Sequence, residues 1–187
     1  MEFYDQTFLK SDFTSNSFTK GEYEQCTFDG CNFNGTDLSN CKFIQCAFSN
    51  CDLSLAKLDK SILQDVIFKD CKMLGLHFYK CNEFALSFSF TNCQLNHSTF
   101  YNTKIKNTKF VNCQLKECDL TQADLTSALF DNCDLLDAHF ENTNLEKTDF
   151  RTSFNYQLAP ELNKIKKARF SLNGLPGLLQ HHGITIE

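Results

Sequence analysis

The sequence predicts an all-β solenoid, in which the chain turns a corner every five residues and stacks its coils into a rod. Large apolar residues recur at every fifth position from Phe3 to Phe78, and again from Phe90 to Phe150. The residue two positions before each of these centres is usually small, and the residue directly before is usually Asp, Asn, Lys or Gln. A period of five fits neither a helix of about 3.6 residues per turn nor a strand that alternates every 2.

The small residue and the large centre of each pentad are expected to point inward together, because strand side chains alternate between the two faces. Coils would then stack through backbone hydrogen bonds at the strand spacing of about 4.8 Å. The register fails at Glu83 and resumes with two extra residues, which predicts a register shift near 79–89. That shift is either a bulge absorbed by the next coil or a protrusion that shapes a partner surface.

The pentads Cys51-Asp52-Leu53 and Ala123-Asp124-Leu125 show the recurring order of a small residue, an Asp or Asn, and a Leu or Phe. This pattern resembles the pentapeptide-repeat family over most of the chain. The resemblance implies a right-handed quadrilateral β-helix with four pentads in each coil, and a short α-helical cap at the C-terminal end.

The eleven cysteines are expected to fill the core rather than to bind metal. Ten of them lie two residues before a large centre, and only Cys81 precedes the failed centre Glu83. A free cysteine behaves as a small hydrophobe, and no C-x-x-C spacing typical of zinc sites occurs. An odd number of cysteines without a signal peptide argues against a disulfide framework. We therefore predict no metal, no cofactor and no catalytic thiol.

The chain divides into a rod over residues 1–152 and a C-terminal cap and dimerisation segment over residues 153–187. Pro160 followed by Glu161 can open a short helix, since proline suits the first helical position and glutamate the first turn. His181 and His182 are adjacent on a predicted helix, so we expect them to point apart as surface residues rather than to act as metal ligands.

A second helix is expected over residues 174–182, ended by Gly183, with a terminal strand at 184–186. The apolar residues of this segment can cap the open end of the solenoid. They also offer more apolar surface than one small cap requires, which predicts an interface with a second copy. The candidate dimer residues are Leu175, Leu178, Leu179, Ile184 and Ile186.

A rod followed by a Pro-Glu excursion, a Leu-rich helix and Gly-Ile-Thr-Ile resembles the Qnr, MfpA and McbG group of pentapeptide-repeat proteins. The resemblance implies a dimer joined through the C-terminal helix. It also implies that the protein imitates duplex DNA, binds DNA gyrase or topoisomerase IV, and protects these enzymes from quinolones or peptide toxins. Qnr-type proteins carry projecting loops, whereas this rod gains only two residues.

Acidic residues concentrate between residues 116 and 149, where nine acids stand against Lys116 and Lys147. They belong either to the acidic surface that the repeat's own preference for Asp produces, or to a mimic of the phosphate backbone that is steered to a basic groove. The candidate partner-binding residues are Glu117, Asp119, Asp124, Asp131, Asp134, Asp137, Glu141, Glu146 and Asp149.

Several functional classes are disfavoured by composition. A net charge of −5 disfavours nucleic-acid binding, which depends on Lys and Arg, and no apolar run approaches the roughly 18 residues of a membrane span. The N-terminus lacks the features of a signal peptide, which predicts a cytoplasmic protein. Every acid is explained by its repeat position, so we predict no enzyme. The alternative to a DNA mimic is a scaffold rod with an unrelated partner, which could use the basic stretch 61–115.

Overall fold

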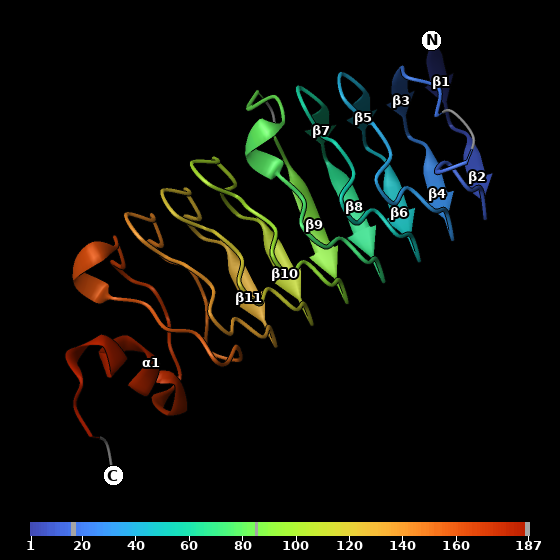
Figure 1. Ribbon diagram of the computed structural model, residues 1–187. Coiled ribbons are helices and arrows are strands. Elements are labelled where there is room, and N and C mark those ends of the chain that lie inside the picture. The colour runs from blue at the N-terminus through green and yellow to red at the C-terminus, as the bar shows by residue number, and fades with distance from the viewer. Residues whose placement is uncertain (16–17, 85, 186–187) are drawn as a thin grey trace.

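The computed structural model describes residues 1–15, 18–84 and 86–185. The chain winds into a rod of stacked coils that runs from the N-terminus to a helical cap (Figure 1). The strands are β1 (Glu2–Tyr4), β2 (Thr7–Leu9), β3 (Glu22–Glu24), β4 (Thr27–Asp29), β5 (Lys42–Ile44), β6 (Ala47–Ser49), β7 (Ile62–Gln64), β8 (Val66–Lys69), β9 (Phe88–Thr91), β10 (Lys109–Val111) and β11 (Leu129–Asp131). The helices are the 3-10 helices η1 (Phe78–Lys80), η2 (Pro160–Leu162), η3 (Leu172–Gly174) and η4 (Gln180–His182), and the α-helix α1 (Pro176–Leu179).

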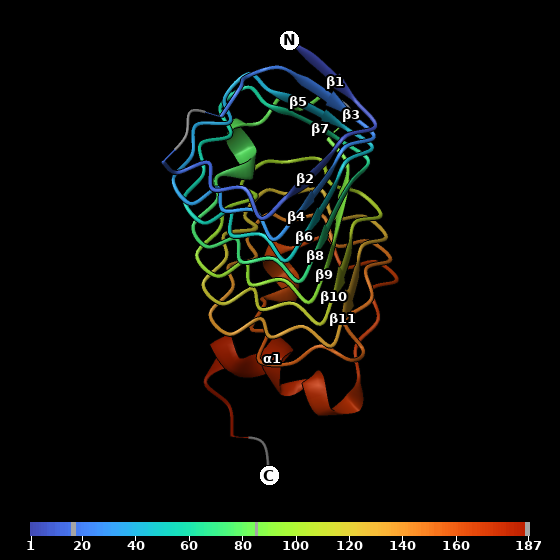
Figure 2. The ribbon, with the colours of Figure 1, turned by 90° about the vertical axis from the view of Figure 1, so that its right-hand side faces the viewer.

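Each strand pairs in parallel with a strand one coil away. One sheet has the order β1-β3-β5-β7, the other contains the remaining seven strands, and Figure 2 shows them as separate faces of the coil. The register joins residues 20 apart, as in Phe8 with Phe28. Isolated parallel bridges, such as Asp12 with Asn32, connect the other faces. Four pentads therefore make one coil, and the predicted quadrilateral β-solenoid is confirmed.

The corners of the coil use left-handed backbone two residues after most of the centres. Asp5 has a φ of 50° and Asn112 a φ of 53°, a region that Asn and Asp tolerate better than most residues. The corner amides donate to the next coil, Asp5 to the Glu24 carbonyl at 3.0 Å and Asn112 to the Asp131 carbonyl at 2.8 Å. Regular pairing between coils thus stabilises a backbone conformation that would be unfavourable alone.

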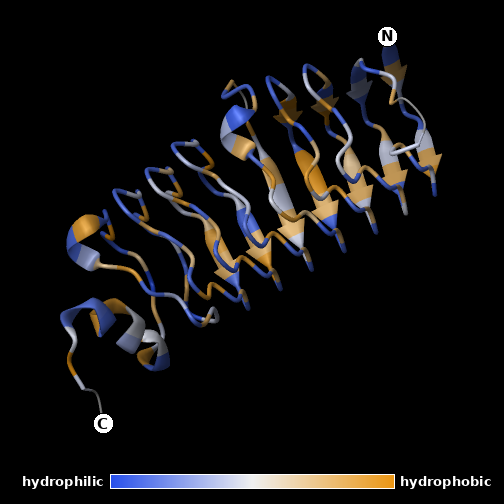
Figure 3. Cartoon of the chain, viewed as in Figure 1, coloured by the Kyte–Doolittle hydropathy of each residue, from blue (hydrophilic) through white to orange (hydrophobic). Residues whose placement is uncertain are grey.

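One face of the rod carries a column of stacked phenylalanine rings, which line the seven-stranded sheet. Neighbouring rings lie 4.7–5.4 Å apart between centroids, and their planes agree within 22°. Apolar residues accordingly recur at the same place in successive coils (Figure 3). The column consists of Phe8, Phe28, Phe48, Phe68, Phe90, Phe110, Phe130, Phe150 and Phe170.

All eleven cysteines are free and buried, so their predicted role in core packing is confirmed. Six of them, spaced by one coil, form a second column on another face: Cys31, Cys51, Cys71, Cys93, Cys113 and Cys133. Five of these thiols donate to backbone carbonyls of the preceding coil, for example Cys51 Sγ to Phe28 O at 3.4 Å and Cys133 Sγ to Phe110 O at 3.3 Å. These bonds satisfy the weak thiol donor in an apolar interior.

Alkaline pH should destabilise the fold through these thiols. Burial raises the pKa of Cys46 to about 11 and those of Cys81 and Cys118 to about 12. An unfolded thiol has a pKa of about 8.5, so the folded state holds these protons more tightly. Their contribution is therefore complete below about pH 8 and is lost as pH rises towards 12.

Urea unfolding at pH 8 and at pH 10.5 measures this loss, and the same experiment on Cys118→Ala separates the thiol effect from the titration of lysines and tyrosines. The variant should lose less stability than the unmodified protein between the two pH values. An identical loss in both proteins would show that the Cys118 thiol does not contribute.

The register shift occurs within the coil that leads to β9. The amide of Asn82 still donates to the Ser61 carbonyl at 2.8 Å, and the amide of Val66 donates to the Ser87 carbonyl at 3.1 Å. The two extra residues therefore lie between Asn82 and Ser87. The side chain of Phe84 is 80% exposed there, while β9 pairs with β8 and restores the regular register. The coil thus accommodates the insertion as a local outward bulge next to η1.

The end of the rod differs in detail from the predicted elements. Parallel bridges continue beyond residue 152, joining Asp149 to Arg169, and Phe170 stacks on Phe150 at 5.4 Å. The helix expected over residues 174–182 is divided into η3, α1 and η4, and ends at Gly183 in the left-handed conformation with a φ of 64°. The predicted terminal strand is wrong at residues 184–185, which form no strand; Ile186 lies outside the described residues.

Candidate partner-binding surfaces

The nine carboxylates between residues 116 and 149 form a band around the rod, which we call the acidic collar. Their positions in the pentads distribute them over all four faces instead of gathering them on one. The four faces carry Asp119 with Glu141, Asp124 with Glu146, Asp131 with Asp149, and Asp134 with Glu117 and Asp137. A partner would therefore meet negative charge from whichever side it approached this part of the rod.

Only some collar carboxylates are ion-paired. The pairs join Asp124 to Lys106 at 3.3 Å, Asp134 to Lys116 at 3.1 Å, Asp149 to Arg151 at 2.8 Å and Glu117 to His97 at 3.4 Å. Hydrogen bonds from Arg151 hold the pKa of Asp149 below its ordinary value. Across residues 1–15, 18–84 and 86–185, no ion pair involves the other five acids: Asp119, Asp131, Asp137, Glu141 and Glu146.

The charge density of the collar is comparable with that of duplex DNA. Nine acids and two lysines over residues 116–149 give a net charge of −7. These residues occupy less than two coils of 20 residues, about 8 Å of rod at the strand spacing. The same length of duplex DNA carries about five phosphate charges. Lys106, Arg151 and Arg169 pair with collar acids from outside this range and reduce the net charge of the collar to −4. The charge per unit length of the collar therefore approaches that of DNA.

The C-terminal cap presents an apolar surface next to the collar. The side chain of Leu178 is only 9% exposed and packs on the end of the rod, whereas Leu175, Leu179 and Ile184 are 41%, 37% and 54% exposed. Leu172 in η3 is also exposed, at 85%, although sequence reasoning did not select it. Of the predicted dimer residues, Leu178 is therefore buried, and Leu175, Leu179 and Ile184 are exposed. Ile186 lies outside the described residues.

Two glycines seat this cap closely against the rod. A Cβ atom at Gly177 would lie 2.1 Å from the carbonyl oxygen of Tyr156, whose side chain is buried. The amide of Leu158 donates to the Gly177 carbonyl at 3.1 Å. A Cβ atom at Gly174 would lie 2.7 Å from the Tyr156 ring. The close approach of α1 therefore depends on the absence of side chains at these two positions.

Substitution of Gly177 by alanine should displace the cap, because the added methyl group collides with backbone and not with a flexible side chain. Overpacking of this kind costs about 1–3 kcal/mol. Chymotrypsin should then cleave the leucine-rich segment 172–179 faster in the variant than in the unmodified protein. Asn173→Ala, at an exposed position of the same segment, is the control. Equal cleavage rates for Gly177→Ala and the control would show that the missing side chain at Gly177 is not needed to hold the cap against the rod.

Comparisons with known proteins agree with the five-residue geometry. The model described as "Pentapeptide repeat region" matches residues 86–154, and two models described as "Pentapeptide repeats", of nine and eight copies, match residues 28–72 and 8–43. The chain is a pentapeptide-repeat protein. A comparison with curated proteins found no match.

Solved structures share the fold of this pentapeptide-repeat protein. A trypsin-treated variant of QnrB1, a plasmid-mediated fluoroquinolone resistance protein, is similar with a TM-score of 0.73 at 17% identity, over 100% of this chain and 92% of that chain. Full-length QnrB1 gives 0.66 at 18% identity, over 98% and 100%. HetL, involved in heterocyst differentiation regulation in the cyanobacterium Nostoc, gives 0.57 at 15% identity, over 93% and 86%. At these identities the likeness is one of fold.

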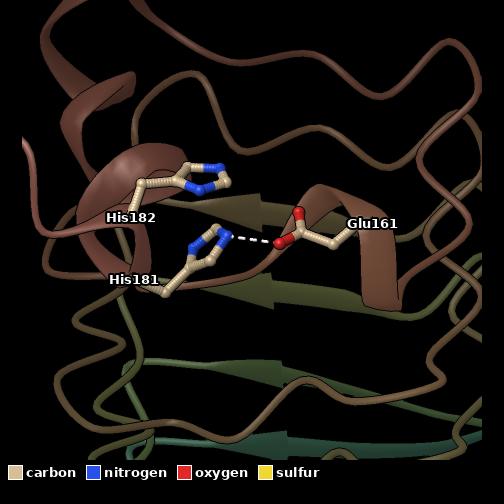
Figure 4. Close-up of side chains that lie close together, drawn as sticks. All are labelled: Glu161, His181 and His182. Atoms are coloured by element: carbon tan, nitrogen blue, oxygen red, sulfur yellow. Dashed lines mark hydrogen bonds and ion pairs between the residues drawn. The ribbon is translucent and has the colours of Figure 1, made fainter.

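A third feature of the cap is a cluster of Glu161, His181 and His182. Nε2 of His181 lies 2.5 Å from Oε1 of Glu161, and the two imidazole rings lie 4.1 Å apart between centroids (Figure 4). We expected the imidazoles to point apart, and this expectation is wrong. His181 turns towards the carboxylate of η2, and His182 packs beside it at the end of η4. Both histidines are exposed, as expected.

No helix within the described ranges has the length and apolar character needed to cross a membrane. The exposed apolar residues Leu172, Leu175 and Leu179 lie in short helical turns at the end of the rod, and Ile184 follows the last of these turns.

Proposed function

We propose that this pentapeptide-repeat protein is a non-catalytic interaction protein that binds a type II topoisomerase, DNA gyrase or topoisomerase IV, as a mimic of duplex DNA. Through this binding it protects the enzyme from quinolones or toxins. The acidic collar is the observation that carries the proposal. It surrounds a straight rod on all four faces with a charge per unit length comparable to that of DNA.

The similarity in fold to QnrB1 over nearly the whole chain supports this proposal. The alignment covers 100% of this chain and 92% of the trypsin-treated QnrB1 chain. A DNA-binding groove carries basic residues that normally contact DNA phosphates. The carboxylates of an acidic rod that enters the groove can form the same kind of ionic contact with these residues. Binding should therefore weaken as the salt concentration rises.

The proposed active form is a homodimer joined through the C-terminal segment. Leu172, Leu175, Leu179 and Ile184 are exposed on the cap, and two such surfaces would bury one another across a two-fold axis. Dimerisation would place one acidic collar on each side of the interface between the two caps, and would so double the length of charged rod. Light scattering on the purified protein measures the number of chains directly.

Burial of the thiols supports a non-catalytic role in the cytoplasm. All eleven cysteine thiols, the strongest nucleophiles among the side chains, are buried in the rod and unpaired. Unpaired thiols in this number fit a reducing compartment. We therefore assign the function to binding surfaces on the outside of the solenoid.

A second candidate function is that of a scaffold rod with an unrelated partner. HetL shows that a similar fold occurs in a protein involved in a different process. The bulge next to η1 favours this alternative, because Phe84, Tyr79 and Tyr101 are 80%, 45% and 40% exposed there. The stretch 61–115 that contains them carries six bases against three acids. A partner of the scaffold type would use this bulge rather than the collar.

A gyrase supercoiling assay with the purified full chain tests the proposed function. We expect increasing protein to inhibit supercoiling, or to relieve the DNA cleavage that a quinolone induces, and both effects to weaken with added salt. The same titration with topoisomerase IV identifies the preferred enzyme. No effect on either enzyme at any dose would refute the proposal and leave the scaffold function.

A further inference from the structure

The cluster at the C-terminal cap joins two segments that are 20 residues apart in the sequence. Glu161 belongs to η2, which leaves the last coil, and His181 and His182 belong to η4. One ligand atom from each of the three side chains lies within 4.8 Å of the other two. Figure 4 shows the three groups directed towards a common point at the surface.

Two imidazole nitrogens and one carboxylate oxygen are the ligand set of many zinc sites that have three protein ligands. Imidazole also suits Cu²⁺ and Ni²⁺, whereas Mg²⁺ and Ca²⁺ prefer oxygen ligands alone. Two ligand atoms bound to a tetrahedral ion at about 2.0–2.2 Å lie about 3.4 Å from each other. Nε2 of His181 and Oε1 of Glu161, now 2.5 Å apart, would separate and exchange their hydrogen bond for bonds to the ion, with the His182 nitrogen, within 4.8 Å of both side chains, as the third ligand. The exposed positions of the side chains allow this adjustment.

The surroundings of the cluster favour a cation. His181 lines a surface depression together with Asp137, His139 and Glu141 of the preceding coil. Asp137 and Glu141 are two of the collar acids that make no ion pair within the described parts of the chain, and no described lysine or arginine lines the depression. A dication bound to the cluster would therefore be attracted by neighbouring negative charge.

We propose that Glu161, His181 and His182 bind one divalent transition-metal ion, with Zn²⁺ the best match. The ion fastens the C-terminal segment to the last coil, because its ligands come from both η2 and η4. Without the ion, the close contact of Gly177 with Tyr156, the packing of Leu178 and the hydrogen bond between His181 and Glu161 hold the segment. This site goes beyond the proposed topoisomerase function, and it can exist whether or not that function is correct.

Calorimetric titration of the full chain, prepared without a histidine tag, with Zn²⁺ tests the site. We expect one ion per chain. Each of His181→Ala, His182→Ala and Glu161→Gln should weaken binding by about tenfold or more, since even residues that only orient ligands contribute about 10–100-fold. His139→Ala is the matched control, because His139 lines the same depression outside the cluster, and it should bind as the unmodified protein does.

A second measurement reports the structural role of the ion. Zn²⁺ should slow chymotrypsin cleavage of the segment 172–179, EDTA should restore the rate, and His181→Ala should remove the effect of Zn²⁺. The proposal is overturned if the unmodified chain binds no Zn²⁺, or if the three variants bind it as tightly as His139→Ala does. Binding that survives in all three variants would place the ion elsewhere, for example at the cysteines.

Discussion

Replacement of Phe110 by alanine should lower the free energy of unfolding by about 3–5 kcal/mol, the usual cost of removing a buried phenyl ring. The ring is fully buried and lies between Phe90 and Phe130 at centroid distances of 5.2 and 4.7 Å. It also meets the edge of Phe100 at 5.9 Å. The coils above and below are held in place by regular backbone pairing, so they cannot collapse into the cavity.

The effect should extend beyond one coil, because each coil of a solenoid contacts only its neighbours and stability depends on the interfaces between them. A cavity at Phe110 weakens the interface between the two halves of the rod. Urea unfolding followed by circular dichroism measures the loss. A transition that separates into two steps would show directly that the halves have become uncoupled.

Phe84→Ala is the matched control for this experiment. It removes the same ring from a side chain that is 80% exposed in the bulge, and surface substitutions usually change stability by no more than about 0.5 kcal/mol. If Phe110→Ala costs no more than Phe84→Ala, the stacked column does not stabilise the rod. The same Phe84 variant also tests the scaffold alternative, because it removes the most exposed aromatic residue of the bulge without changing the collar.

The triple variant Asp137→Asn, Glu141→Gln and Glu146→Gln should raise the concentration needed to inhibit gyrase supercoiling by about tenfold or more, the lower end of electrostatic effects on association. None of these three carboxylates takes part in an ion pair within residues 1–15, 18–84 and 86–185. Their neutralisation therefore leaves no basic partner uncompensated, and the solenoid should keep its stability. The variant should also show a weaker dependence of inhibition on salt.

A matched control neutralises three acids at the opposite end of the rod. Glu2→Gln, Asp5→Asn and Glu24→Gln change the net charge by the same amount, and these carboxylates likewise form no ion pair with any residue that the structure describes. Inhibition should change little in this control. Equal losses in the two triple variants would mean that only the net charge matters, and no loss in either would exclude the collar as the binding surface.

The rod could be predicted in detail because its contacts repeat. A residue in a regular coil contacts the residues 20 positions before and after it, so the five-residue pattern alone places Phe110 in the core and assigns the cysteines to the interior. The insertion near Glu83 was visible as a break in the pattern. The way in which the chain accommodates this insertion could not be predicted, because Leu86 and Phe88 fill the core outside the regular spacing, while Phe84 is exposed to solvent.

The cap contains no repeat, so the arrangement of its residues was revealed only by the tertiary structure. The meeting of Glu161 with His181, the seating of Gly177 on Tyr156, and the inward direction of Leu178 all depend on how one irregular segment folds back on the last coil. The amino-acid sequence by itself determined the solenoid, its core and the concentration of acids between residues 116 and 149. The physical reason is that periodic backbone pairing converts sequence position into spatial position, whereas a segment without a period is placed by its side-chain contacts.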